Sequence, residues 1–307
     1  MGFILSTSWN AYRHTDAKGM LFEIKEAGFA EVELSFNLTC TMVGSIEKMV
    51  KEGSIRVASL HNFCPFPDNL QREVALPDYY SLASPDAGER SLALQYTKRT
   101  IDTAQRLNAR AVILHTGRVE IPDKTRDLIS LYEQGLFCSA EFAQVKKTAI
   151  SDRQNKNQPY FDNALKSLDE LVPYSARSGI SLGVENRFYY REIPSLKELG
   201  IILNKFRGSS IFYWHDVGHA LIMEKLGFVE PDGYLKSYAQ AMLGIHLHNV
   251  LGLTDHQVPQ RGEFDFAKLK PVLQNKTLKV IEAHHPATSQ DLKEAKAFLE
   301  ETLGRDD

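Results

Sequence analysis

The sequence predicts an α/β fold in which eight parallel strands, each followed by a helix, close into a (β/α)8 barrel. Short apolar runs alternate with longer amphipathic segments from one end of the chain to the other, a pattern typical of repeated βα units. Eight such runs are present, and the last is followed by a helical segment and no further strand, which favours a closed barrel over an open sheet. A length of 307 residues suits one barrel with enlarged loops.

The expected strands are short and apolar, as parallel strands buried on both faces usually are. They span residues 3–8, 31–35, 56–61, 109–115, 180–185, 210–216, 244–248 and 278–283. Amphipathic segments with apolar residues at every third or fourth position predict helices that include 18–28, 90–107, 162–178 and 290–303. Gly28, Gly53 and Gly179 stand where helices would end, because glycine readily adopts the left-handed conformation of a helix C-cap.

Two connections are too long to be simple turns. Residues 62–88, rich in Pro and Asp, follow the third expected strand, and residues 116–160 follow the fourth. The second connection is expected to contain a short helical hairpin around residues 125–147. Both follow strands, so both lie at the barrel face where active sites are built. The two connections either form a lid that covers the active site and selects the substrate, or they play no part in the site.

Composition narrows the class of protein. A net charge of -3 and a pI near 6.4 exclude a protein that attracts polyanions through its overall charge. The three cysteines are an odd number with no CxxC pair, which fits a reducing compartment better than a disulfide framework. The N-terminus lacks the basic and apolar regions of an export signal, and no stretch approaches the roughly 18 apolar residues of a membrane span. We therefore expect a cytoplasmic protein.

Six of the expected strands end on, or close to, a side chain that can bind a metal ion. These side chains are His61, His115, Glu185, Asp216, His246 and Glu282. The C-terminal ends of parallel barrel strands meet at one mouth, so we expect these groups to converge. Crowded carboxylates repel one another unless they are protonated or bound to cations. The sequence therefore predicts a divalent metal site. Mixed carboxylate and imidazole donors without thiolate suit Zn²⁺, Mn²⁺, Co²⁺ or Fe²⁺, and we expect zinc or manganese, with one to three ions.

Five segments, in the expected order, resemble motifs of the xylose isomerase-like TIM barrel superfamily. This superfamily holds sugar isomerases and epimerases and the endonuclease IV group of apurinic-site nucleases. The segments are Glu185-Asn186 (its E-N), Asp216-Val217-Gly218-His219-Ala220 (its D-x-x-H-A), His246-Leu247-His248-Asn249 (its H-x-N/D), Gly262-Glu263-Phe264-Asp265-Phe266 (its G-x-x-D-F/W) and the eighth-strand Glu282. The resemblance covers nearly the whole chain and implies one domain over residues 1–307.

The resemblance implies that Glu185, Asp216, His246 and Glu282 bind the metal ion shared by the superfamily. It also implies that His219 is a further ligand or contacts the substrate. In the epimerases and many isomerases, the metal polarises a sugar carbonyl while the fifth- and eighth-strand glutamates exchange a proton with the neighbouring carbon. Because Glu185 and Glu282 fill those places, the chain is expected to be a sugar or sugar-phosphate isomerase or epimerase.

A multi-zinc phosphodiesterase of the endonuclease IV type is the main alternative. That group adds histidines on the third and fourth strands, which His61 and His115 match, and an aspartate and a histidine in the seventh loop. His256 fits the loop histidine, but Thr254 then stands where the aspartate belongs. If Asp255 is instead aligned with the aspartate of an Asp-His-Arg segment found in epimerases, the loop resembles that segment but lacks its arginine. The loop fits neither class cleanly.

Charge near the predicted mouth favours a small carbohydrate over nucleic acid. A DNA-gripping face needs many phosphate-binding cations, whereas these loops mix arginines with acidic residues. We expect the substrate to contact His219, Arg187, His248 and Trp9. Four further histidines are expected to contact the metal-binding side chains and fix their orientation: His14, His215, His284 and His285. A non-catalytic metal-binding barrel is the second alternative, although structural metal sites are usually closed and tetrahedral.

Overall fold

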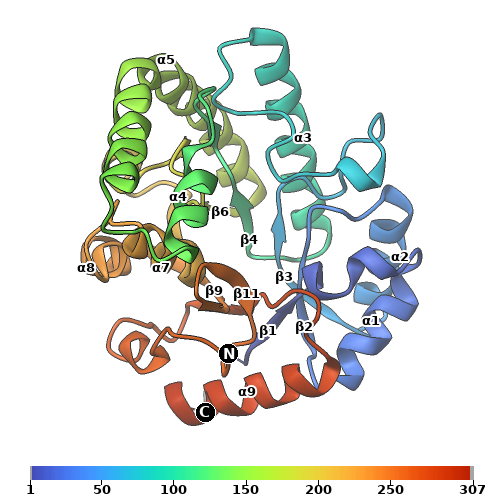
Figure 1. Ribbon diagram of the computed structural model, residues 1–307. Helices are drawn as coiled ribbons and strands as arrows, with labels where there is room; N and C mark the ends of the chain where they lie inside the picture. The colour runs from blue at the N-terminus through green and yellow to red at the C-terminus, as the bar shows by residue number, and fades with distance from the viewer. Residues whose placement is uncertain (1, 305–307) are drawn as a thin grey trace.

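The computed structural model describes residues 2–304, and its eight parallel strands form a closed barrel (Figure 1). The strands are β1 Ile4–Ser6, β2 Glu31–Leu34, β3 Arg56–His61, β4 Ala111–Leu114, β6 Ser181–Glu185, β8 Ile211–Asp216, β9 Met242–Leu247 and β12 Leu278–Ile281. They follow one another around the barrel in chain order, and β12 closes it by pairing with β1. The predicted (β/α)8 fold is confirmed, with each expected strand present.

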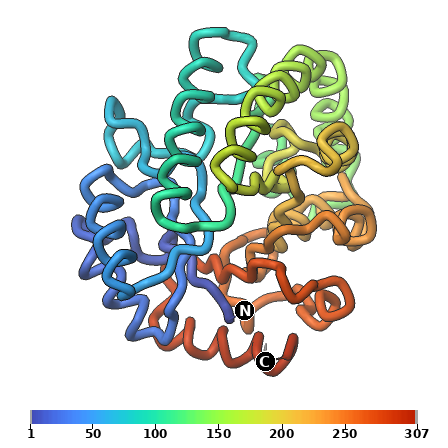
Figure 2. The backbone as a smooth tube through the Cα atoms, turned by 180° about the vertical axis from the view of Figure 1, so that it is seen from behind, coloured from blue at the N-terminus to red at the C-terminus, as the bar shows by residue number. Residues whose placement is uncertain are grey.

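Helices cover the outside of the barrel, as the view from behind also shows (Figure 2). They are α1 Ala17–Glu26, α2 Cys40–Lys51, α3 Ala87–Arg106, α4 Lys124–Glu133, α5 Ala140–Ser178, α6 Leu196–Lys205, α7 Val217–Lys225, α8 Gly233–Tyr238 and α9 Ser289–Leu303. Side-chain N-caps start several of them; Asp16, for example, accepts a hydrogen bond from the backbone N–H of Gly19. Gly179 ends α5 in the left-handed conformation, as its sequence position predicts.

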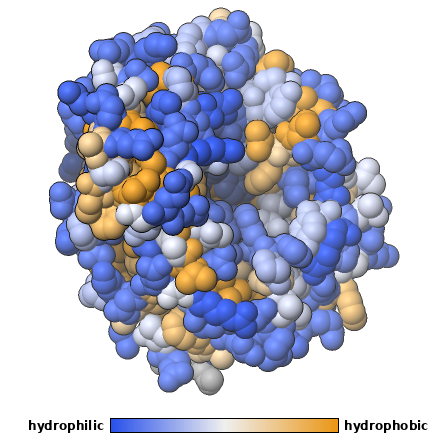
Figure 3. All heavy atoms as spheres, in the orientation of Figure 1, coloured by the Kyte–Doolittle hydropathy of each residue, from blue (hydrophilic) through white to orange (hydrophobic). Residues whose placement is uncertain are grey.

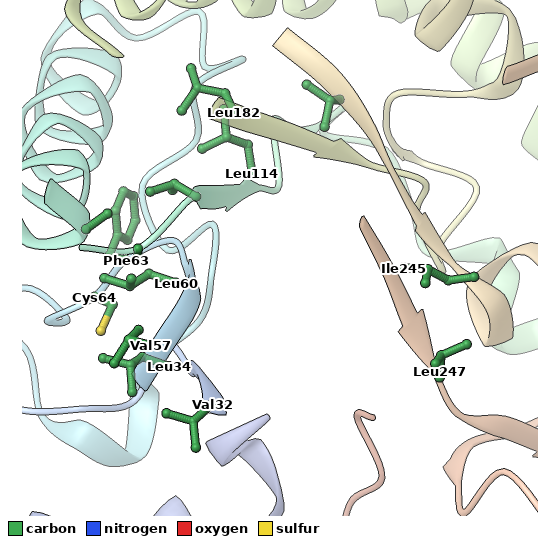
Figure 4. Packing of buried hydrophobic residues seen from close by; sticks show 14 of the residues in the cluster. Val32, Leu34, Val57, Leu60, Phe63, Cys64, Leu114, Leu182, Ile245 and Leu247 are labelled. Atoms are coloured by element: carbon green, nitrogen blue, oxygen red, sulfur yellow. The ribbon is translucent and has the colours of Figure 1, made fainter. Parts of the chain in front are cut away.

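Two apolar layers hold the barrel together. Alternate strand residues face outward and pack against the helices; Figure 4 shows Val32, Leu34, Val57 and Leu60 of this layer. The residues between them face inward and form a smaller cluster, which consists of Ile4, Ala58, Ala111, Ile113, Trp214, Leu278 and Val280. Trp214 fills much of this interior, because neighbouring strands present glycines to its ring: a Cβ atom on Gly244 would lie 2.2 Å from it. This plug forms a floor beneath the mouth, and its ring centroid lies 5.3 Å from that of His246.

The long connections are built differently from one another. Residues 62–86 contain one short 3-10 helix, Arg72–Val74, whereas the connection after β4 holds the expected helical hairpin of α4 and α5. The prediction that this hairpin is short, with a loop up to residue 160, is wrong: α5 runs for 39 residues without a break. Its first half packs on α4 above the barrel and exposes many polar side chains, so its apolar periodicity is weak.

Two small antiparallel pairs lie at the mouth. β5 (Gly117–Arg118) pairs with β7 (Glu192–Ile193) and joins the connections after β4 and β6. β10 (Asn249–Leu251) pairs with β11 (Thr254–Gln257) in the connection after β9. These pairs fix the loop residues that surround the strand ends. Across residues 2–304, none of the helices combines the length and the apolar character needed to cross a bilayer.

Candidate metal centre

Four of the predicted ligands meet at the C-terminal ends of their strands. Glu185 ends β6, Asp216 ends β8, His246 is the last but one residue of β9, and Glu282 follows β12 directly. Each offers a ligand atom within 4.8 Å of the others, and all four side chains are buried. We call this group the four-donor cluster. Its convergence follows from the parallel barrel, which brings its strand ends to one face.

His246 lies at the centre of this cluster. Its Nδ1 atom is 2.9 Å from a carboxylate oxygen of Glu185, 2.9 Å from one of Glu282 and 3.5 Å from one of Asp216. Its other ring nitrogen, Nε2, lies 3.0 Å from Oε1 of Glu33 on β2. Glu33 in turn accepts a hydrogen bond from the hydroxyl of Ser59. Three carboxylates, those of Glu185, Glu282 and Asp216, thus face Nδ1 of His246. The carboxylate of Glu33 contacts the other ring nitrogen, Nε2.

The electrostatics of the cluster reflect this excess of carboxylates. Burial alone would raise the pKa of Glu185, but its interactions with His115 and His246 hold it well below its usual range. Burial alone would lower the pKa of His246, yet the charges of Glu282 and Glu33 raise it well above its usual value. Oxygen and imidazole donors with surplus negative charge match what a divalent transition metal binds, so the residues fit such an ion.

Side chains behind the ligands fix their orientation. The amide oxygen of Asn186 accepts hydrogen bonds from the backbone N–H of Asp216 and the hydroxyl of Tyr213, while its NH2 group donates to the Asp216 carbonyl. His248 is fully buried, and its Nε2 lies 3.0 Å from both carboxylate oxygens of Asp216. The backbone N–H of His256 donates to Nδ1 of His248, which leaves the ring proton on Nε2, facing Asp216. His248 thus contacts Asp216, and it also forms a group with Asp216, His256 and Glu282 whose ligand atoms lie within 4.8 Å of one another. The expected contact of His248 with the substrate stays a prediction.

A second group of possible ligands adjoins the four-donor cluster through Glu185. His61, His115 and Glu185 bring ligand atoms within 4.8 Å of one another. Nε2 of His115 lies 2.6 Å from Oε2 of Glu185, and Nε2 of His61 lies 3.7 Å from the same oxygen. Nη1 of Arg187 also lies 2.9 Å from this oxygen. Burial and the Arg187 charge lower the pKa of His115 well below its usual value, so its ring is neutral.

A third group lies on the other side of the mouth. His219, Asp255 and His256 again offer ligand atoms within 4.8 Å of one another. Nδ1 of His219 lies 3.1 Å from the carbonyl oxygen of Asn186, which leaves its Nε2 facing Asp255 at 3.9 Å. Burial would lower the pKa of His256, but the charge of Asp255 raises it to about 9. His219 and His256 were expected here, whereas Asp255 was considered only in one of the two alignments of the loop and was not among the expected ligands.

The second and third groups line one open cavity of about 400 Å³, together with Glu282 of the four-donor cluster. Figure 3 shows a surface that is largely polar and is hollowed near the middle of the face. Five loop side chains add an apolar or aromatic wall to the ligand groups: Phe36, Leu76, Pro77, Phe188 and Tyr189. A cavity of this size suits a molecule the size of a sugar. A larger cavity of about 660 Å³ lies around the start of β8 and β9, where Ile211 and Met242 belong to its wall, and includes none of the predicted ligands.

Several expected residues lie outside this cavity. Trp9 is buried, and its indole N–H donates to the carbonyl of Ala287, so its expected substrate contact has no support in the arrangement. His14 pairs with Glu23, and His285 packs against the ring of Tyr12. His215 lies behind the mouth, hydrogen-bonded to Tyr213, and burial lowers its pKa to about 4. His284 does line the cavity, where it stacks on His256 with ring centroids 3.8 Å apart.

Sequence reasoning missed two residues that contact the ligands. Glu33 carries a carboxylate into the barrel interior from the middle of β2, between Val32 and Leu34. An acidic residue flanked by apolar residues in an expected buried strand is a signal that could have identified it. Asp255 lies in the third group because the β10–β11 hairpin places it beside His219 and His256. The sequence motifs do not predict the geometry of this hairpin.

A family model for xylose isomerase-like TIM barrels matches residues 21–302. The chain therefore belongs to this family, as its sequence motifs predict. A search of the curated proteins found no match.

Similar solved structures cover nearly the whole chain. They include a D-tagatose 3-epimerase-like protein, with a TM-score of 0.68, 18% identity and coverage of 99% of this chain and 97% of that one. An L-ribulose 3-epimerase gives a TM-score of 0.67, 15% identity and coverage of 99% and 95%. A Thermus thermophilus protein soaked with zinc chloride gives 0.61, 19% identity and coverage of 99% and 98%. At these identities the likeness establishes a shared fold.

Proposed function

We propose that this member of the xylose isomerase-like family is a divalent-metal-dependent isomerase or epimerase that acts on a small carbohydrate. The observation that carries the proposal is the four-donor cluster at the base of an open, sugar-sized cavity. Two of its members, Glu185 and Glu282, also line that cavity and so can reach a bound substrate. The sugar epimerases among the structural neighbours support the same class of reaction.

The four-donor cluster would hold one zinc or manganese ion. Such an ion polarises a carbonyl oxygen and makes the neighbouring C–H bond more acidic. The carboxylates themselves have the properties that proton transfer requires. Burial would raise the pKa of Glu282, but the charge of His246 and its hydrogen bond lower it far below its usual range. Both glutamates are therefore ionised at neutral pH, so either can accept a proton from the carbon. The other glutamate must first take up a proton from solvent before it can return one to the carbon.

The remaining cavity residues suit a polyhydroxylated molecule. Imidazoles can donate or accept hydrogen bonds, and the cavity presents His61, His115, His219, His256 and His284. Phe36 and Phe188 offer aromatic faces against which the apolar side of a sugar ring can pack. Arg187 also lines the cavity, although its guanidinium is already engaged with two carboxylates. We propose that these groups bind and orient the substrate.

The experiment compares turnover of free and phosphorylated ketoses and aldoses by protein stripped of metal and then reloaded with Zn²⁺ or Mn²⁺. Activity should appear only after reloading, and Glu185→Gln and Glu282→Gln should each lower kcat by roughly 100-fold or more, as expected for removal of an acid–base group. Glu26→Gln, at an exposed position of α1, is the matched control and should keep full activity. Full activity in protein without metal would overturn the proposal.

Phosphodiester hydrolysis is a second candidate because further groups of possible ligands, among them the second and third groups, adjoin the four-donor cluster. Several neighbouring cations can neutralise the attacking and leaving oxygens of a phosphate together. The Thermus thermophilus neighbour soaked with zinc chloride is compatible with this possibility. The test is hydrolysis of bis(p-nitrophenyl) phosphate and of an oligonucleotide with an abasic site. Cleavage that requires His61 and His115, without any turnover of sugars, would establish this candidate in place of the first.

A further inference from the structure

Arg187 places a permanent positive charge against a carboxylate of the candidate metal centre. Its side chain is only 6% exposed, and Nη1 lies 2.9 Å from Oε2 of Glu185. Its Nη2 lies 3.0 Å from Oε1 of Glu192, which is also buried. A guanidinium does not lose its proton in proteins, so this charge persists at every pH at which the protein is folded.

The oxygen that Arg187 holds is the one that a second ion would need. His61 and His115 both direct Nε2 toward Oε2 of Glu185, at 3.7 and 2.6 Å. The other oxygen, Oε1, faces Nδ1 of His246 in the four-donor cluster. A zinc ion bound by the two histidines would have to lie roughly 2 Å from Oε2. It would then be within a few ångströms of the guanidinium, which repels it and occupies the same lone pairs.

Arg187 is also held firmly in this position. Glu192 belongs to β7, and its Oε2 accepts a hydrogen bond from the backbone N–H of Tyr189. β7 pairs with β5, and the hydroxyl of Thr116 donates to the carbonyl of Ile193 at 2.6 Å. Moving the guanidinium aside would leave Glu192 buried without its cation, which is strongly unfavourable. The loops after β4 and β6 thus keep Arg187 against Glu185.

We propose that Arg187 acts as a built-in cation that prevents tight binding of a metal ion at the group formed by His61, His115 and Glu185. The two histidines would then be left to contact the substrate, and Glu185 would serve as a ligand of the four-donor cluster alone. The inference rests on the proposed function in taking that cluster as the ion's site. It adds a residue that determines how many ions the centre holds.

The test counts zinc ions per chain. Protein is equilibrated with excess Zn²⁺, freed of loosely bound metal by gel filtration and measured by elemental analysis. The double variant Arg187→Met with Glu192→Gln removes both members of the buried pair, so neither charge is stranded. It should bind one more ion per chain than the wild type. Glu192→Gln alone keeps the guanidinium and should match the wild type. Adding His115→Ala to the double variant should remove the extra ion.

Two results would overturn the inference. One is a double variant that has a cooperative thermal transition like that of the wild type and gains no ion. The other requires no change at Arg187: if His115→Ala alone loses a tightly bound ion, the wild type already holds one at this group. Turnover is measured separately, so a wild type that binds the ion of the four-donor cluster but converts no sugar would refute the proposed reaction and leave this inference intact.

Discussion

Nε2 of His246 and Oε1 of Glu33 lie 3.0 Å apart inside the barrel, and both side chains are fully buried. The two residues come from β9 and β2, which are separated by other strands in the barrel order. A carboxylate that accepts the proton on one imidazole nitrogen fixes the tautomer and leaves the other nitrogen free to bind a metal ion. Glu33 is therefore expected to orient His246 toward the four-donor cluster.

Glu33→Gln should weaken binding of Mn²⁺ or Zn²⁺ by roughly 10- to 100-fold, the usual effect of removing a hydrogen-bond partner from a ligand histidine. The affinity is measured by calorimetric titration of metal-free protein. Glu31→Gln is the matched control, because Glu31 begins the same strand but pairs with Arg110 away from the site. Equal affinity in the Glu33 variant and the wild type would show that His246 needs no such partner.

Asn186→Ala should lower both stability and metal affinity. The Asn186 side chain makes three hydrogen bonds, two to the backbone of Asp216 and one from Tyr213, and all of these groups are buried. Leaving buried polar groups without partners costs about 1–3 kcal/mol each. Denaturant unfolding measures the stability, and metal titration measures the affinity. A variant with normal affinity despite lowered stability would restrict Asn186 to a folding role.

Gly244→Ala should destabilise the barrel by about 1–3 kcal/mol, because the added methyl group would overlap Trp214 in the fully buried interior. Gly44→Ala makes the same chemical change in α2, where a Cβ atom meets no neighbour within 4 Å. It should instead stabilise the protein by roughly 0.5–1 kcal/mol through helix propensity. The free energy of unfolding in urea distinguishes these outcomes. Equal stability of the two variants would mean that the interior yields to the extra volume.

Glu224 should make folding stability depend on pH. Burial raises its pKa from 4.5 to about 7, although a hydrogen bond from the backbone N–H of Asp232 favours the ionised form. Between these values the folded chain keeps a proton that the unfolded chain releases. Its contribution to stability is therefore greatest below pH 4.5 and is lost as the pH rises to about 7. Glu224→Gln should increase the free energy of unfolding more at pH 8 than at pH 5.

The matched control for this prediction is Glu294→Gln, which makes the same chemical change at an exposed position of α9. If Glu224→Gln gives the same change at pH 5 and pH 8, Glu224 ionises normally in the folded protein.

Much of the fold follows from local sequence patterns. β3 has the predicted bounds, 56–61, because an apolar run between polar residues is a sufficient signal for a buried strand. The extent of α5 did not follow, since the half of that helix that packs on α4 lacks a clear apolar stripe. Strand ends converge in a parallel barrel whatever the loops do, so the four-donor cluster was predictable. The ion pair between Arg187 and Glu192 was not, because it depends on the pairing of β5 with β7.

The most direct test of the proposed function is exchange of substrate hydrogen with solvent. Metal-loaded protein is incubated in D2O with free ketoses such as D-fructose and D-ribulose, and proton NMR follows the carbon next to the carbonyl. The proposal predicts that deuterium enters at this carbon in at least one sugar, and that Glu282→Gln slows the exchange by roughly 100-fold or more. Absence of exchange in every sugar tested, by protein that holds its ion, would contradict proton transfer next to a carbonyl.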